Sequence, residues 1–135
     1  MISVLYVDDE QGLLDLAKIF LEDEGEFRVE IATSARKVLD APSAPSYDAI
    51  VSDYQMPVMD GIAFLKIVRE RFGKVPFILF TGRGREEVVM DALNNGADFY
   101  LQKGGEPTAQ FAELSNKIRY AVARRQAETE LQRKN

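Results

Sequence analysis

The stretch VLYVDDE, residues 4–10, passes from four apolar residues directly into three acidic ones. A short apolar run of β-branched and aromatic residues is typical of a strand that is buried on both faces. Four further runs rich in such residues follow, at Phe27–Ala32, Ala49–Ser52, Pro76–Phe80 and Ala97–Leu101. The first run therefore predicts a strand whose carboxyl end carries Asp8 and Asp9.

Segments with helical spacing separate the predicted strands. Their apolar stripes lie at Leu13–Leu21, Phe64–Val68, Val89–Leu93 and Phe111–Val122, and a weaker helix is predicted at Ser34–Leu39. Asp60 is suited to the N-cap of the helix that contains Phe64–Val68, and Pro107 is suited to the first turn of the last helix. Asn95 and Gly96 are suited to a left-handed C-cap after Val89–Leu93. Strands that alternate with helices predict an α/β fold with a parallel sheet. Because Phe27–Ala32 alternates between apolar and polar residues, we expect this strand at an edge.

Length and composition narrow the classes of function. A chain of 135 residues fits a single domain with its own core. The sequence contains no Cys and no His, which excludes disulfides, thiolate metal sites and imidazole catalysis and argues against a typical zinc site. No apolar run approaches the ~20 residues that span a bilayer, and the N-terminus lacks a signal-peptide pattern. We therefore expect a cytoplasmic protein that does not bind membranes.

The net charge of −5 is unevenly distributed. Residues 117–135 hold six Lys or Arg and two Glu, a balance of +4, which leaves −9 for residues 1–116. An acidic body argues against direct binding of nucleic acid. The basic tail carries its own acids, which favours a solvated helix face over a DNA-binding arm. The predicted division is a domain at 1–123, followed at 124–135 by a helical C-terminal extension or a truncated linker.

Residues able to bind a metal ion or a phosphate stand at the ends of four predicted strands. They are Asp8 with Asp9, then Asp53, Thr81 and Lys103. Ligands of an open α/β sheet bind beyond the carboxyl ends of the strands, where the winding direction switches. In the sheet order 2-1-3-4-5, the first and third strands flank that point. We therefore expect these five side chains to meet in one pocket.

The expected pocket has the composition of a phosphoryl-transfer site. Clustered carboxylates repel one another unless a cation lies between them, and hard oxygen ligands suit Mg²⁺, with Mn²⁺ as the alternative. An aspartate beside such a metal can attack phosphorus and form an aspartyl phosphate. The Lys103 ammonium and the Thr81 hydroxyl can then stabilise charge on the equatorial oxygens.

Four motifs, VLYVDDE, SDYQMPVMDG, FTGRG and YLQKG, occur in this order. Together they resemble the receiver domain of two-component response regulators, within the superfamily of the chemotaxis regulators. The resemblance covers roughly residues 1–122. It implies a flavodoxin-like (βα)5 three-layer sandwich with a parallel five-stranded sheet in the order 2-1-3-4-5.

The resemblance implies a role for each residue of the pocket. Asp53 would be the phosphoacceptor and a metal ligand. Asp9 would bind Mg²⁺ directly and Asp8 through water, while the backbone carbonyl of Gln55 completes the protein ligands. Thr81 and Lys103 would contact the phosphoryl oxygens.

Further residues near the pocket have implied roles in switching and in the lifetime of the phosphoryl group. Tyr100 would change rotamer together with Thr81. Gln55 and Arg83, each two residues beyond a residue of the pocket, would tune the lifetime. Gly82 would leave access to the pocket open because it has no side chain.

The same resemblance implies a signalling function. A sensor histidine kinase would donate its phosphoryl group in a Mg²⁺-dependent reaction. The change would be transmitted through the face of helix 4, strand 5 and helix 5 to a downstream protein or a C-terminally attached domain, or to a second copy in a phosphorylation-dependent homodimer. The domain would not be an enzyme beyond its self-catalysed phosphotransfer and autodephosphorylation.

The sequence departs from the family pattern in two respects. Receivers usually have a proline after the lysine, joined through a cis peptide, whereas Gly104 and Gly105 follow Lys103 here. A cis bond without proline costs about 2.5–4 kcal/mol, so the expected loop is trans, more mobile, or both. The second departure is that no output domain lies within the 135 residues.

Two other functions remain open from the sequence. A phosphatase of the haloacid dehalogenase type also uses Asp, Mg²⁺, Thr and Lys, but it carries a second Asp two residues after its nucleophile, where this chain has Gln55. A constitutive receiver-like interaction module would keep the fold without accepting phosphate. Gly104 and Gly105 favour that module, and the five residues of the pocket argue against it.

Overall fold

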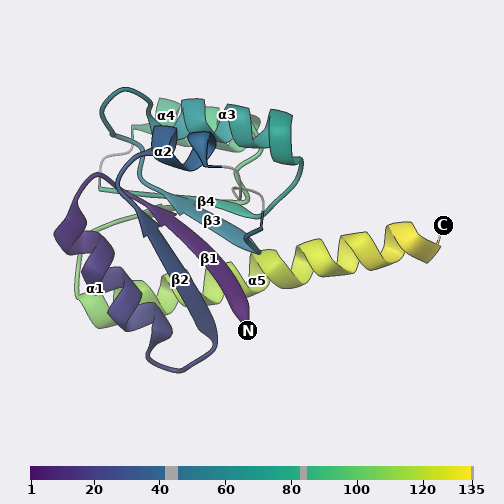
Figure 1. Cartoon of the computed structure of the whole chain (residues 1–135), viewed down its shortest axis with the longest axis horizontal. Helices are drawn as coiled ribbons and strands as arrows, with labels where there is room; N and C mark the ends of the chain where they lie inside the picture. Colours follow the sequence, from purple (N-terminus) through teal and green to yellow (C-terminus); the bar gives the residue numbers. More distant parts are fainter. Residues whose placement is uncertain (42–45, 83–84, 135) are drawn as a thin grey trace.

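The computed structural model describes residues 1–41, 46–82 and 85–134. Strands and helices alternate along this part of the chain (Figure 1). The strands are β1 (Ile2–Val7), β2 (Phe27–Ala32), β3 (Ala49–Ser52), β4 (Phe77–Thr81) and β5 (Phe99–Gln102). The helices are α1 (Gln11–Glu22), α2 (Ala35–Asp40), α3 (Gly61–Phe72), α4 (Glu86–Asn94) and α5 (Pro107–Lys134).

The strands form one parallel sheet in the order β2-β1-β3-β4-β5, as predicted. Helices α1 and α5 cover one face of the sheet, and α2, α3 and α4 cover the other (Figure 1). The flavodoxin-like three-layer sandwich is therefore confirmed. Strand β2 lies at an edge, in agreement with its alternating sequence.

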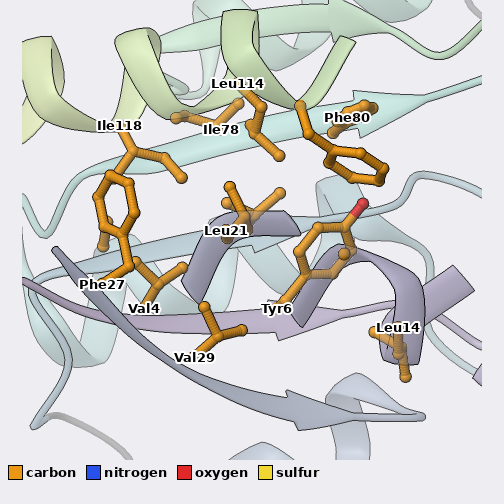
Figure 2. Close-up of a cluster of buried hydrophobic side chains, with 14 of the residues drawn as sticks. Val4, Tyr6, Leu14, Leu21, Phe27, Val29, Ile78, Phe80, Leu114 and Ile118 are labelled. Carbon is orange, nitrogen blue, oxygen red and sulfur yellow. The ribbon is translucent and has the colours of Figure 1, made fainter. Parts of the chain in front are cut away.

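Strand β1 is apolar and buried from Val4 to Val7 because both of its faces are covered there. Val4 and Tyr6 belong to the core beneath α1 and α5, and Figure 2 shows Tyr6 beside Phe80. Leu5 and Val7 point to the other core, beneath α2, α3 and α4. In this covered part of the strand, successive side chains enter the two cores in turn, which favours apolar residues until the strand leaves the sheet. Its first acid, Asp8, follows at that point.

The predicted bounds of three strands were wrong by one or two residues: β1 begins at Ile2 rather than at Val4, and β4 and β5 end at Thr81 and Gln102, one residue later than predicted. Strand β4 begins after Pro76, which lacks an N–H group and enters the sheet only through its carbonyl, an acceptor for Ile50 N at 2.8 Å. Ala97 precedes β5 because its N–H donates to Ala92 O at 3.0 Å and thus closes the end of α4.

The predicted helix boundaries agree with the structure. Asp60 caps α3, with its Oδ1 accepting from Ile62 N at 2.9 Å and Ala63 N at 2.8 Å. Gly96 has a φ of 96° just beyond α4, and Pro107 is the first residue of α5. These signals are local, which explains why they could be recognised without the tertiary structure.

Helix α5 continues well beyond the sheet, and its C-terminal part projects from the body (Figure 1). Arg124 pairs with Glu128 at 3.3 Å, one turn apart, and Leu131 is 63% exposed. The division between a domain at 1–123 and an extension at 124–135 stays a prediction. Within the described part of the chain, no helix is both long enough and apolar enough to cross a membrane.

Val58, in the loop between β3 and α3, has a backbone conformation that β-branched residues rarely adopt. Its φ is 72° and its side chain is 91% exposed, so burial of the side chain does not offset the backbone strain. We expect Val58→Asn to raise the free energy of unfolding by about 1 kcal/mol, because Asn tolerates the left-handed region. Urea denaturation measures this gain. Val58→Ile keeps the branched carbon and should give none; equal stability of both variants would contradict the prediction.

Candidate metal and phosphoryl site

The pairing of β1 with β3 brings the predicted acids together. Val7 lies opposite Ser52, so the next residues, Asp8 and Asp53, leave the sheet side by side. The Asp53 N–H donates to Val7 O at 2.9 Å and continues the pairing by one residue. Carboxylate oxygens of Asp8, Asp9 and Asp53 all lie within 4.8 Å of one another. The sheet itself therefore sets the spacing of the acids.

Lys103 reaches the same cluster from the far edge of the sheet. Its N–H donates to Thr81 O at 2.9 Å, which extends the β4–β5 pairing past Gln102. Its ammonium lies 2.6 Å from Asp8 Oδ2 and 3.6 Å from Asp53 Oδ2. Lys103 thus bridges two of the acids, with its side chain only 17% exposed.

The net negative charge of the cluster suits a divalent cation. Asp8 is fully buried, and its oxygens accept from Glu10 N at 3.0 Å and from the Lys103 ammonium. Three carboxylates and one ammonium leave two formal negative charges without a partner. Buried carboxylates are costly unless cations neutralise them. An all-oxygen donor set with this balance fits a hard divalent ion such as Mg²⁺.

The two oxygens of Asp53 have different surroundings. Oδ1 accepts from Tyr54 N at 2.8 Å, which fixes the carboxylate plane. Oδ2 faces Lys103 Nζ at 3.6 Å, too far for a hydrogen bond. Asp53 is therefore held through one oxygen by a backbone N–H, while its other oxygen faces the ammonium. The side chain of Asp53 is 11% exposed.

The loop that follows Asp53 passes very close to it at Gly61. A Cβ atom at Gly61 would lie 2.1 Å from the Asp53 carbonyl oxygen and 2.8 Å from Leu79 Cδ1. The Gly61 N–H donates to Tyr54 O at 2.8 Å, which closes the loop. Glycine is therefore required by the close approach of two backbone segments.

The remaining predicted residues lie around this centre. Thr81 is buried at the end of β4, and Gly82 is exposed beside it. A Cβ atom at Gly82 would be 3.9 Å from Lys103 Cβ. Exposed Gln55 lines, together with Gly82 and Arg85, an open cavity of about 600 Å³. Arg83 lies outside the described residues.

Two tyrosines have buried hydroxyls, and that of Tyr6 lies near Asp8 and Asp53. Among the described residues, the Tyr6 and Tyr100 hydroxyls have no hydrogen-bond partner. Burial raises the pKa of Tyr6, and the negative charges of Asp8 and Asp53 raise it further. Burial also raises the pKa of Tyr100. The sequence suggested Tyr100, but Tyr6 was hidden within an apolar run and carried no signal beyond its residue type.

A parallel sheet of this order, with acids and a lysine at the carboxyl ends of β1, β3 and β5, defines a class of doubly wound α/β proteins that bind ligands at the switch point. The family model described as the response regulator receiver domain matches residues 4–116. The chain belongs to this family, which confirms the resemblance seen in the sequence.

The comparisons with individual proteins agree with this membership. The chain is 35% identical to the response regulator Rre1 of Synechocystis over 131 residues. This aligned stretch covers 96% of this chain and 55% of that protein. It is 30% identical to the transcriptional regulatory protein FixJ of Bradyrhizobium diazoefficiens, over 87% of this chain and 57% of that protein. The chain thus spans about half the length of these curated relatives.

Solved structures show the same fold. A response regulator receiver domain protein from Clostridium thermocellum superposes with a TM-score of 0.81 at 27% identity, covering 94% of this chain and 98% of that one. The chemotaxis protein CheY4 of Vibrio cholerae gives a TM-score of 0.72 at 30% identity, over 86% of this chain and 98% of that one. Both likenesses extend over nearly the whole receiver chain.

Proposed function

We propose that this chain is a phosphorylation-controlled switch in which Asp53 accepts a phosphoryl group from the phosphohistidine of a sensor histidine kinase. The observation that carries the proposal is the position of the Lys103 ammonium, between Asp8 and Asp53 at the edge of a three-carboxylate cluster. A receiver that had lost its chemistry would have no need to bury Asp8 and Asp53 beside a lysine, because buried charges cost stability.

The proposed reaction is a direct displacement at phosphorus. Asp53 Oδ2 attacks the phosphorus atom, a P–O bond forms, and the P–N bond to the kinase imidazole breaks with its electron pair returning to nitrogen. The Lys103 ammonium and the Thr81 hydroxyl donate to the equatorial oxygens, where charge develops. A divalent cation held by Asp8, Asp9, Asp53 and the Gln55 carbonyl would supply further charge neutralisation.

The proposed readout is the face formed by α4, β5 and α5. An aspartyl phosphate carries about −1.5 to −2 units of charge in place of the −1 of the free carboxylate, which draws Thr81 and the loop after β4 toward the phosphoryl group and alters the space beside Tyr100. Exposed apolar side chains support this face as a contact surface; they are Met90, Leu93 and Tyr120. A downstream protein, an attached domain or a second copy of the chain would bind there, and a cytoplasmic location accompanies this proposal.

Acetyl phosphate with Mg²⁺ tests the chemistry by intact-mass measurement. We expect wild-type protein to gain the mass of one phosphoryl group, because Asp53 is oriented and partly neutralised for attack. Asp53→Asn should gain none, and removal of Mg²⁺ with EDTA should abolish the gain in wild type. Asp48→Asn, at an exposed acid near the start of β3, is the matched control and should be phosphorylated like wild type.

The outcomes separate the two rival functions from the switch. No mass gain with acetyl phosphate or with a phosphorylated kinase would favour the constitutive interaction module. Hydrolysis of small phosphate esters over many turnovers would favour the phosphatase, although Gln55 stands where that class needs its acid-base aspartate. A gain that persists in Asp53→Asn would place the phosphoacceptor elsewhere.

A further inference from the structure

The loop between β5 and α5 contains two adjacent glycines in conformations that other residues rarely adopt. Gly104 has a φ of 135° and Gly105 a φ of 96°. A Cβ atom on either would meet nothing within 4 Å, so the backbone angles themselves require glycine. The peptide between Lys103 and Gly104 is trans, since the described residues include no cis bond. Glycine pairs are intrinsically flexible, so this loop needs an external restraint if Lys103 is to be held in place.

The side chain of Gln110 supplies such a restraint. Its Nε2 donates to Gly104 O at 2.9 Å and to Gln102 O at 3.3 Å. These two carbonyls are those immediately after and immediately before Lys103. The Lys103 N–H donates to Thr81 O at 2.9 Å. The backbone of Lys103 is thus fixed on one side by β4 and on the other by a single carboxamide.

Gln110 is itself held on a rigid element. Glu106 caps α5, with its carboxylate accepting from Thr108 N at 3.0 Å and Ala109 N at 2.9 Å. The pKa of Glu106 is lowered by these backbone hydrogen bonds. The next residue along the helix, Phe111, is 3% exposed in the core and stacks on Phe20 with ring centroids 5.2 Å apart. The first turns of α5 therefore present the carboxamide from a fixed position.

We propose that Gln110 is a positioning residue for phosphotransfer, which acts by fixing the backbone of Lys103 so that its ammonium stays between Asp8 and Asp53. This inference rests on the proposed function for its chemical consequence. Loss of the carboxamide frees the Gly104–Gly105 loop, and the ammonium is then found less often at the developing charge. No role is assigned to Gln110 in binding the metal.

Gln110→Met tests the proposal because methionine has a similar length and helix preference but no N–H donor. We expect phosphorylation by acetyl phosphate at saturation to slow about threefold to tenfold, because the loss of exposed hydrogen bonds such as these raises an activation barrier by only a modest amount. Mg²⁺ affinity and the melting temperature should remain those of wild type. Gln126→Met, at an exposed position in the extension of the same helix, is the control and should match wild type in all three measurements.

A double-mutant cycle with Lys103→Met tests whether Gln110 acts through the lysine. We expect Gln110→Met to have no further effect on the rate once the ammonium is gone. Equal rate losses in both backgrounds would overturn the proposal, as would a wild-type rate for Gln110→Met.

Backbone hydrogen exchange separates this proposal from the proposed function. In Gln110→Met we expect the Lys103 amide to exchange at least several times faster, while core amides of β1 and β3 are unchanged. This measurement needs no phosphorylation, so it decides the restraint even if wild type accepts no phosphoryl group. Unchanged exchange at Lys103 would overturn the proposal on structural grounds.

Discussion

Replacing Lys103 by methionine is expected to slow phosphorylation of Asp53 about 10²- to 10³-fold, the loss seen when one preorganised charge-stabilising donor is removed. The physical reason is the location of the ammonium, 3.6 Å from Asp53 Oδ2 in a site with little exposure. Methionine fills similar space without charge. The rate constant at saturating acetyl phosphate and Mg²⁺ measures the effect.

The same substitution should change stability in a way that depends on the metal. Asp8 is fully buried and would lose a cation 2.6 Å from its Oδ2. Breaking a buried pair from one side costs about 3–5 kcal/mol. We therefore expect Lys103→Met to lower the free energy of unfolding in EDTA, and Mg²⁺ to restore more of it than in wild type, since a ligand stabilises the state that binds it.

Lys66→Met is the matched control for this pair of effects. Lys66 is exposed on α3, away from the acids, so its loss should leave both the rate and the response to Mg²⁺ unchanged. If Lys103→Met kept the wild-type rate, the ammonium would have no part in the chemistry. If EDTA and Mg²⁺ gave the same difference in stability as in wild type, the proposed neutralisation of Asp8 would be wrong.

The sequence predicted the fold well because its signals are local or periodic. The apolar run Val4–Val7 predicts a strand that is buried on both faces, and the acids that follow it can lie only at the edge of the sheet. Caps at Asp60 and Gly96 need no knowledge of distant contacts. The meeting of Asp8, Asp53 and Lys103 follows from the order of a parallel sheet, so it too could be predicted.

What the sequence left open depends on distances between segments far apart in the chain. Gln110 is an ordinary helix residue until its carboxamide is seen on the carbonyls around Lys103. The sequence predicts only that Tyr6 is a core residue, whereas the structure shows that its hydroxyl is buried without a hydrogen-bond partner among the described residues. The sequence left open whether the peptide between Lys103 and Gly104 is cis or trans, and the structure shows that it is trans. Such features come from tertiary packing, which periodicity does not encode.

Gly61→Ala is expected to destabilise the protein by about 3 kcal/mol, because an atom is forced into a closely packed contact that has no room to relax. The added Cβ would lie 2.1 Å from the Asp53 carbonyl oxygen, which is backbone and cannot rotate away. The same Cβ atom would also lie 2.8 Å from Leu79 Cδ1. Urea denaturation in EDTA measures the loss.

The clash should also affect the phosphorylation rate, because the atom displaced belongs to Asp53, the proposed phosphoacceptor. A shift of the Asp53 backbone weakens the Tyr54 N–H bond that orients its carboxylate, so phosphorylation should slow even where the variant remains folded. Gly12→Ala is the control: Gly12 lies in α1 with nothing within 4 Å of an added Cβ, and alanine there should stabilise by up to about 1 kcal/mol. A Gly61→Ala variant as stable and as readily phosphorylated as wild type would show that the loop after β3 can yield, and that the close approach of Gly61 does not hold Asp53 in place.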